Sequence, residues 1–152
     1  MIRNMEEYSP SLRVILETGE KMLASGSPAL DVVEQCVSML EDDPLYNAGR
    51  GSVLNNRGKI EMDASIMNGQ NLAAGAVAAV HSIKNPVRLA RMVMDKSDHV
   101  MLIADGAMEF AREKGKTDFP PLLYGTRPWH EFLYALKKQY KNRFPELECI
   151  GD

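Results

Sequence analysis

The feature that constrains this sequence most is a run of small apolar residues at positions 72–80, in which no side chain is polar. Such a run suits a central β-strand that is covered on both faces, with a neighbouring element packed very close to its backbone. A buried helix is the competing interpretation. The chain has 152 residues, 45% of them apolar and 26% charged, so it is long enough to form a core around this segment.

Two amphipathic helices are predicted ahead of this run. Between about residues 9 and 25 apolar side chains recur at helical spacing, and Gly26 suits the C-cap. Ser27 then offers an N-cap, and Pro28 a first helical residue, for a second helix that runs to about Leu40. Because the connection is so short, we expect a helical hairpin that packs on another part of the molecule.

The apolar period changes from helical to strand-like after this hairpin. Residues 59–66 alternate polar and apolar, which is typical of a half-buried strand. The residues at 55–58 predict a tight turn back to a short strand at 52–54. Asn68 and Gly69 predict a second turn, which leads into the apolar run.

The remaining elements alternate helix and strand. Pro86 opens a predicted helix, residues 99–104 predict a buried strand and residues 105–115 a further helix. A loop at 116–124 and a last amphipathic helix after Pro128 complete the pattern. Strands joined by tight turns imply antiparallel pairing, so the predicted fold class is α+β or mixed α/β. The helices are too few to cover both faces of four strands, which predicts part of a core rather than a whole one.

Composition excludes several classes of function. The 18 basic and 21 acidic side chains give a net charge of −3, which argues against bulk electrostatic binding to nucleic acid or to an anionic membrane. No stretch approaches the ~18 consecutive apolar residues of a membrane span, and the N-terminus lacks the apolar run of a secretory signal. The two cysteines, Cys36 and Cys149, have no CxxC spacing, so a cytoplasmic location is expected.

Familiar catalytic motifs are absent from the sequence. It contains no GxSxG, P-loop, GxGxxG or HExxH pattern. Glu61 and Asp63 share a strand face, where they are either a general acid/base pair or two solvated carboxylates. Ser52 and Ser65 have no evident base, so the pattern displays no nucleophile. The histidines, which are spaced for no familiar metal site, are His81, His99 and His130.

The most unusual segment is the glycine-rich loop at residues 40–52. Pro44 disfavours the helical conformation for the residue before it, which ends the helix. Gly49 and Gly51 permit positive φ, which lets successive carbonyl or amide groups converge on one point. Converging carbonyl oxygens would suit a hard cation such as sodium, whereas the simpler alternative is a tight connector.

Four segments in this order closely resemble the plant-type L-asparaginase / isoaspartyl peptidase family, and the resemblance covers about residues 12 to 115. Members of this family are N-terminal-nucleophile hydrolases with an αββα sandwich, made as one precursor that cuts itself into an α and a β subunit. The cut exposes a threonine at the start of the β subunit. The resemblance therefore implies that this chain is the α-subunit half of such a sandwich. The segments are residues 41–52, 61–67, 75–80 and 85–94.

The resemblance also implies an activity and an assembly. Paired with its β subunit, the chain would hydrolyse L-asparagine and isoaspartyl dipeptides, the threonine attacking and its own α-amino group serving as general base. Residues 1–152 would form one domain half with no catalytic residue of its own, inactive alone, in an (αβ)2 heterotetramer. Residues 116–152 would be the variable linker that leads to the autocleavage site at Asp152.

The resemblance implies that this chain contributes residues that support the reaction rather than carry it out. The glycine-rich loop resembles the family's sodium-binding loop, in which backbone carbonyls hold Na⁺ or K⁺, and no other cofactor is expected. Side-chain identity there is expected to matter less than loop geometry. Asn47 matches the asparagine that reaches toward the nucleophile. The six carbonyl donors would be those of Leu40, Glu41, Asp43, Tyr46, Ala48 and Arg50.

One departure from the family concerns the start of the chain. The family begins with a β-strand and a glycine-rich turn, and the present sequence starts at Met1 beyond both. Two alternatives to the active α subunit therefore remain: a truncated, non-catalytic relative or binding fragment, and, more weakly, a glycosylasparaginase, which the lack of an export signal disfavours.

Overall fold

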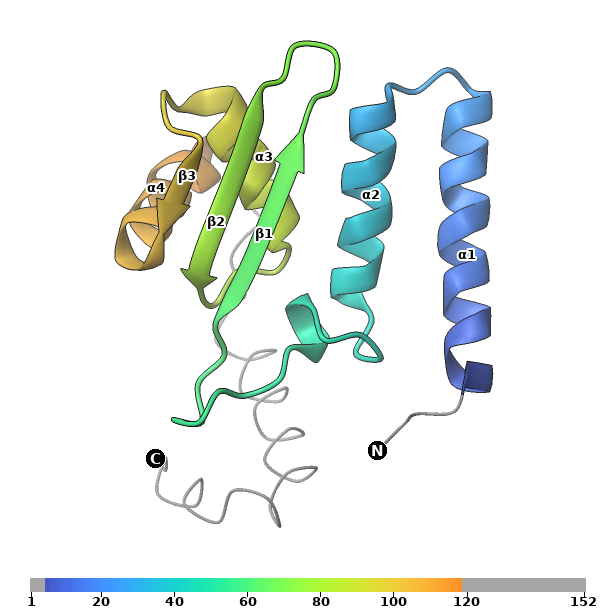
Figure 1. The fold of residues 1–152 in the computed structure, drawn as a ribbon, viewed down its shortest axis with the longest axis horizontal. Coiled ribbons are helices and arrows are strands. Elements are labelled where there is room, and N and C mark those ends of the chain that lie inside the picture. Colours follow the sequence, from blue (N-terminus) through green and yellow to red (C-terminus); the bar gives the residue numbers. More distant parts are fainter. Residues whose placement is uncertain (1–4, 119–152) are drawn as a thin grey trace.

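The computed structural model describes residues 5–118, in which four helices, a short 3-10 helix and three strands alternate along the chain (Figure 1). The α+β fold class is confirmed. The prediction of a loop at 116–124 is wrong for its first residues, because a helix extends to Asp118. The rest of that loop, the helix predicted after Pro128, and His130, Cys149 and Asp152 lie outside the described residues. The elements are α1 (Met5–Ala24), α2 (Ala29–Asp42), η1 (Gly49–Gly51), β1 (Met62–Met67), β2 (Ala74–Val80), α3 (Pro86–Lys96), β3 (Met101–Ile103) and α4 (Ala104–Asp118).

The predicted helical hairpin is present and its turn has the expected chemistry. Gly26 adopts a φ of 83°, and its amide donates to the carbonyl of Leu23 at 3.0 Å. The next amide, that of Ser27, donates to the carbonyl of Met22 at 3.0 Å, which ends α1 as a glycine C-cap. Helix α2 begins one residue later than predicted, because Pro28 is its N-cap and no side chain caps it.

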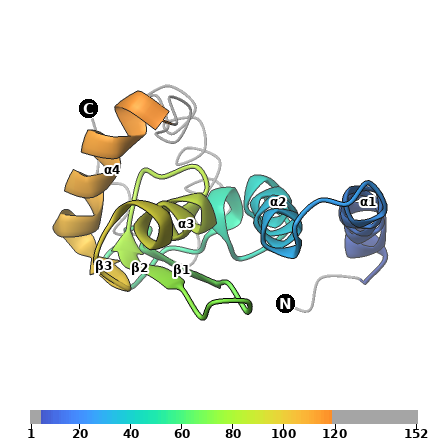
Figure 2. The same ribbon diagram turned by 90° about the horizontal axis from the view of Figure 1, so that it is seen from above.

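The predicted central strand is the middle strand of the sheet. The order is β1-β2-β3, with β1 antiparallel and β3 parallel to β2. A Cβ placed on Gly75 of β2 would lie 2.1 Å from the carbonyl oxygen of Ala90 in α3, which confirms the predicted close approach to the backbone. Helices α3 and α4 lie over the same side of the sheet (Figure 2). The core between these layers includes Val77, Val80, Leu89, Val93, Ala107 and Ala111.

The other face of the sheet is open in the part of the chain that the structure describes. Alternate residues of a strand point to opposite faces, so Ala76 and Ala78 of β2 face away from α3 and are only half-buried. On the neighbouring strands Met67 is 56% exposed and Ile103 59%. Within residues 5–118, the prediction that 72–80 is covered on both faces therefore holds for one face only. The strand predicted at 99–104 is present as the shorter β3, but the prediction that it is buried is wrong, because Met101 and Ile103 are exposed.

Two strand boundaries also differ from the prediction, because asparagine side chains accept hydrogen bonds from backbone amides that would otherwise pair with a neighbouring strand. The predicted strand at 52–54 is absent, and the amide of Val53 donates to Oδ1 of Asn47 at 2.9 Å. The amide of Asn55 donates to the carbonyl of Lys59 at 2.8 Å, and that of Lys59 to Oδ1 of Asn55 at 3.0 Å. This closed turn delays the start of β1 to Met62.

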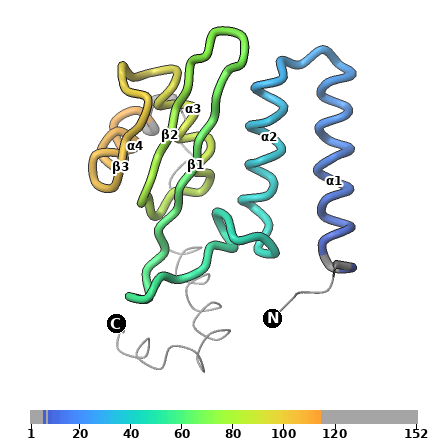
Figure 3. Tube along the Cα trace, viewed as in Figure 1, coloured from blue at the N-terminus to red at the C-terminus, as the bar shows by residue number. Residues whose placement is uncertain are grey.

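The helical layer extends further than the sheet beneath it. Figure 3 traces the chain from the hairpin of α1 and α2 to the three strands, and Figure 2 shows α1, α2 and α3 side by side with the sheet under α3 alone. Gly19 of α1 lets the helices approach, since a Cβ there would lie 3.0 Å from Sγ of Cys36. Apolar side chains of the hairpin remain exposed, among them Leu16 at 71% and Leu23 at 56%. No described helix is both long and apolar enough to cross a membrane.

Candidate functional site

The glycine-rich loop turns back sharply on the end of α2. Gly49 has a φ of 48°, and a Cβ there would lie 2.4 Å from the carbonyl oxygen of Glu41. Gly51 has no positive φ, but a Cβ there would lie 2.0 Å from the carbonyl oxygen of Tyr46. Gly49 is therefore required for both its positive φ and the lack of space for a side chain, and Gly51 for the lack of space alone. The loop is a tightly closed unit, not an extended connector.

The structure places all six predicted carbonyl donors in this segment. Leu40 and Glu41 lie in the last turn of α2, Asp43 at its C-cap, Tyr46 and Ala48 in the turn that follows, and Arg50 in η1. Three of these carbonyls accept loop amides, including Ala48 from the amide of Gly51 at 2.9 Å. A carbonyl oxygen has a second lone pair, and a set of neutral oxygen donors fits a hard cation. The cation site itself stays a prediction.

A cavity of about 260 Å³ opens beside the loop and brings several of the singled-out side chains together. Asn47 is exposed at this cavity, and its Oδ1 accepts the amide of Val53 at 2.9 Å, which fixes the side chain in one orientation. Ser52 is 4% exposed and lies at the same wall. The acidic residues of the lining are Glu41, Glu61 and Asp63.

The pair Glu61 and Asp63 has local structural partners. Glu61 accepts the side-chain amide of Asn55 at 2.9 Å through Oε2. Asp63 accepts the backbone amide of Ala79 at 2.8 Å through Oδ1, at the irregularity in the β1–β2 pairing where Ala79 has a φ of 52°. Both side chains are also exposed, which favours the plainer interpretation of two solvated carboxylates over an acid/base pair.

The other candidates of the sequence are dispersed. His81 and His99 are exposed, and Ser65 lies exposed on β1. Cys36 is half-buried between α1 and α2 and has no disulfide partner among the described residues. Within residues 5–118 no group of three or more histidine, cysteine, aspartate and glutamate side chains could hold a metal ion.

Sequence reasoning missed the side chain of Glu41, which is 3% exposed. Its Oε1 accepts the backbone amide of Val87 at 2.9 Å, and this bond caps the first turn of α3 from the end of α2. Burial raises the pKa of Glu41 to about 7, against the opposing effect of the Val87 amide. The sequence did contain a signal for this contact. A glutamate followed by two aspartates at the end of an amphipathic helix needs hydrogen-bond donors or positive charges nearby.

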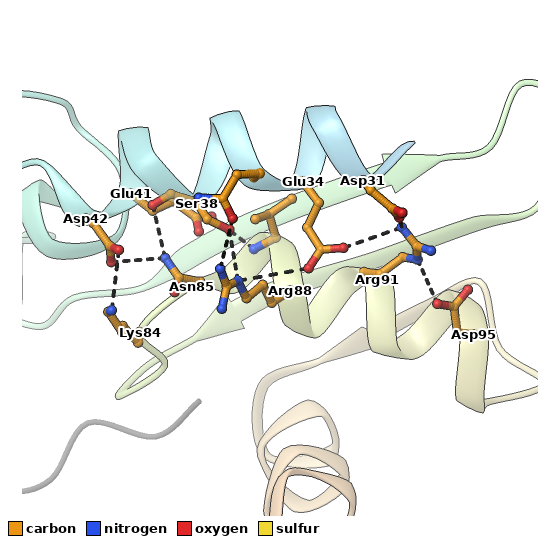
Figure 4. A network of polar contacts seen from close by, with 12 residues as sticks. Asp31, Glu34, Ser38, Glu41, Asp42, Lys84, Asn85, Arg88, Arg91 and Asp95 are labelled. Carbon is orange, nitrogen blue, oxygen red and sulfur yellow. Dashed lines mark hydrogen bonds and ion pairs between the residues drawn. The ribbon is translucent and has the colours of Figure 1, made fainter. Parts of the chain in front are cut away.

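A row of polar contacts joins α2 to α3 and fixes the helix end from which the loop starts (Figure 4). Nδ2 of Asn85 donates to the carbonyl of Ser38 and to Oδ1 of Asp42, each at 3.2 Å. Nε of Arg88 donates to Oγ of Ser38 at 3.1 Å. Further along, Arg91 contacts Asp31 at 3.2 Å, Glu34 at 3.4 Å and Asp95 at 2.7 Å. Burial raises the pKa of Glu34, opposed by Arg91 and Arg88.

Comparison with known protein families matches residues 2–148 to the family described as Asparaginase, so the chain belongs to the asparaginase family. Among curated proteins it is 51% identical over 136 residues to a plant-type L-asparaginase of Pyrococcus furiosus, which covers 86% of this chain and 44% of that protein. It is 46% identical over 132 residues to an isoaspartyl peptidase of Escherichia coli, covering 87% and 41%. An isoaspartyl peptidase/L-asparaginase of Xenopus laevis is 50% identical over 145 residues, covering 95% and 46%.

The chain spans less than half the length of these relatives. The predicted resemblance to the plant-type L-asparaginase / isoaspartyl peptidase family is confirmed, and it extends beyond residues 12 to 115. The relatives' activities belong to proteins more than twice as long as the matched segment.

Proposed function

We propose that this chain is the α-subunit half of an L-asparaginase / isoaspartyl peptidase, with the threonine nucleophile on a second, β subunit. The family assignment supports the reaction class, and the names of the relatives support asparagine and isoaspartyl dipeptides as substrates.

The open face of the sheet is the structural observation that carries this proposal. Half-buried Ala76 and Ala78 line its centre, and exposed Met67, Met101 and Ile103 lie around them. Small residues let a second sheet pack at about 10 Å, and exposed apolar side chains on both flanks give it a surface to bury. An αββα sandwich needs such a second sheet, which the partner half would supply.

This chain's own contribution is to support the reaction. The threonine of the partner would attack the side-chain carbonyl of asparagine and release ammonia, and water would then resolve the acyl-enzyme. Asn47 presents a non-titrating amide at the cavity, where it can hydrogen-bond the threonine hydroxyl or an attending water. A Na⁺ or K⁺ held by the carbonyls of the glycine-rich loop would stiffen the segment that carries Asn47. We place the assembled protein, an (αβ)2 tetramer, in the cytoplasm.

The test is to produce the chain together with its second half and to measure ammonia release from L-asparagine and cleavage of a β-aspartyl dipeptide. Turnover of either substrate supports the proposal. No turnover by the assembled protein would favour the truncated, non-catalytic relative, and turnover of a glycosylated asparagine alone would favour a glycosylasparaginase.

Asn47→Ala gives the residue-level test, with Asn71→Ala as its matched control. Asn71 is exposed, and its Oδ1 also accepts a backbone amide, that of Ala73 at 3.0 Å, but it lies in the β1–β2 turn away from the cavity. Loss of a hydrogen bond in the transition state should lower kcat about tenfold in Asn47→Ala and leave the control unchanged. Equal activity in both variants would remove Asn47 from the site.

A further inference from the structure

A second set of contacts holds the glycine-rich loop from the side away from α3. Helix α1 flanks α2 on that side (Figure 2), and its N-terminal turns lie at the same end of the hairpin as the loop (Figure 1). The hydroxyl of Tyr8 donates to the carbonyl of Leu45 at 3.2 Å. Oγ of Ser11 donates to Oδ2 of Asp43 at 2.5 Å and accepts the hydroxyl of Tyr46 at 3.3 Å. We call Tyr8, Ser11, Asp43 and Tyr46 the α1 clamp.

The clamp is built from side chains in specific geometry. The rings of Tyr8 and Tyr46 meet edge to face, with centroids 5.5 Å apart and an interplanar angle of 66°. The carboxylate of Asp43 is shared, because its Oδ1 accepts the amide of Leu45 at 2.9 Å while its Oδ2 accepts Ser11. The side chains of Asp43 and Tyr46 therefore also contribute contacts that hold this loop.

The clamped residues are continuous with the part of the loop that reaches the cavity. A Cβ on Gly51 would lie 2.0 Å from the carbonyl oxygen of Tyr46, so the backbones of these two residues are in close contact. Asn47 follows Tyr46 directly, and its side chain bonds the amide of Val53. A displacement at Tyr46 would therefore reach Asn47 through the peptide bond that joins them, and through the close contact of Tyr46 with Gly51.

We propose that Tyr8 and Ser11 of α1 are positioning residues for the glycine-rich loop. They fix Asp43 and Tyr46, and through them they set where the side chain of Asn47 lies at the cavity. The consequence for catalysis rests on the function proposed above, whereas the consequence for loop order does not. The two helices on either side of α2 then have complementary tasks, since α3 fixes the helix end and α1 fixes the turn.

Hydrogen exchange tests the effect on loop order, measured on the full chain alone and again together with its second half. Ser11→Ala removes two clamp bonds and Tyr8→Phe removes one, and we expect the amides of residues 45–53 to exchange about fivefold faster in each variant. Ser25→Ala is the matched control, because the Oγ of Ser25 bonds the carbonyl of Met22 at 2.8 Å at the far end of the same helix. Ser11→Thr keeps the hydroxyl and should restore the original exchange.

The kinetic constants provide the second readout. A merely structural weakening of α1 would lower the amount of folded protein, whereas displacement of Asn47 should lower kcat about three- to tenfold in Ser11→Ala with KM unchanged, and Ser11→Thr should recover it. Unchanged exchange at 45–53 in both Ser11→Ala and Tyr8→Phe would overturn the proposal. So would faster exchange with unchanged kcat in a protein that turns over asparagine. If the parent protein hydrolyses neither substrate, the proposed function fails, and hydrogen exchange alone decides whether the clamp orders the loop.

Discussion

At the scale of single residues, Glu41 links the stability of the fold to pH. Its pKa is raised to about 7 in the folded chain, above the ordinary value of 4.5, so the folded state binds a proton more tightly than the unfolded state. The stability that this group contributes is therefore complete below about pH 4.5 and is lost as the pH rises through 7.

Glu41→Gln should flatten this dependence, because glutamine can still accept the amide of Val87 and does not titrate. Between pH 5 and pH 8 the free energy of unfolding of the parent should fall by up to about 3 kcal/mol more than that of the variant, as urea denaturation would measure. Glu61→Gln, at an exposed side chain with its own amide partner, should behave like the parent. Parallel curves for Glu41→Gln and the parent would show that Glu41 does not carry the pH response.

Gly75 sets the distance between β2 and α3. A methyl group there would lie 2.1 Å from the carbonyl oxygen of Ala90 and 2.6 Å from the amide nitrogen of Met94, both of which are backbone atoms. Since backbone cannot rotate away, Gly75→Ala should displace the helix and lower the free energy of unfolding by about 3 kcal/mol. Gly69→Ala, where a Cβ meets nothing within 4 Å, should change it by less than about 0.5 kcal/mol. Similar thermal midpoints for both variants would contradict the close contact.

At the scale of elements, Asn85 joins the first turn of α3 to the last turns of α2. It is 2% exposed, and its Nδ2 donates to the carbonyl of Ser38 and to the carboxylate of Asp42. Asn85→Ala should cost about 1–3 kcal/mol, since it leaves a buried carbonyl without this donor. Asn85→Asp should cost more at pH 7, because it places a carboxylate against two acceptors, and it should recover part of the loss at low pH. Urea midpoints for the two variants that fall in the opposite order would contradict this arrangement.

The elements that sequence analysis predicted well are those whose formation depends on apolar period alone. The hairpin of α1 and α2, the central strand β2 and helix α3 follow from apolar spacing and from Gly26 and Pro86. The boundaries it missed depend on individual polar side chains. The side chains of Asn47 and Asn55 accept hydrogen bonds from backbone amides that the alternating apolar pattern assigns to strands. Whether an amide bonds a nearby side chain or a neighbouring strand does not change the apolar pattern, so the sequence does not reveal it.

The candidate site divides in the same way. Asn47 and the glycine-rich loop were found from motif and resemblance, and the structure places them together at one cavity. Glu41, Tyr8 and Ser11 were missed as side chains, because their roles are defined by partners 32 to 46 residues away in the sequence. Helical periodicity assigns Tyr8 and Ser11 a face of α1, but it does not reveal that a loop lies against that face.

At the scale of the whole molecule, the incomplete core predicted from the sequence has a definite location. Helices α3 and α4 complete one side of the sheet, while the described chain leaves the other side and the underside of α1 and α2 uncovered (Figure 2). Exposed apolar side chains on a sheet of three strands favour association. When this chain is expressed and purified without a second half, it should therefore self-associate in a concentration-dependent way, which sedimentation velocity would detect.

Ala76→Arg should separate the two roles of this open face. Ala76 lies between Ser65 of β1 and Met101 of β3 at the centre of the sheet, and its side chain points away from α3. A charge there would be buried without a partner against a second sheet, so assembly and amide hydrolysis should fall by more than about tenfold. The same charge is solvated when the chain is alone, so self-association should decrease. Gln70→Arg, exposed in the β1–β2 turn, adds equal charge and should alter neither property. Full hydrolysis by an assembled Ala76→Arg protein would mean that no second sheet packs on this face, and the sandwich would have to be built from a different surface of the chain.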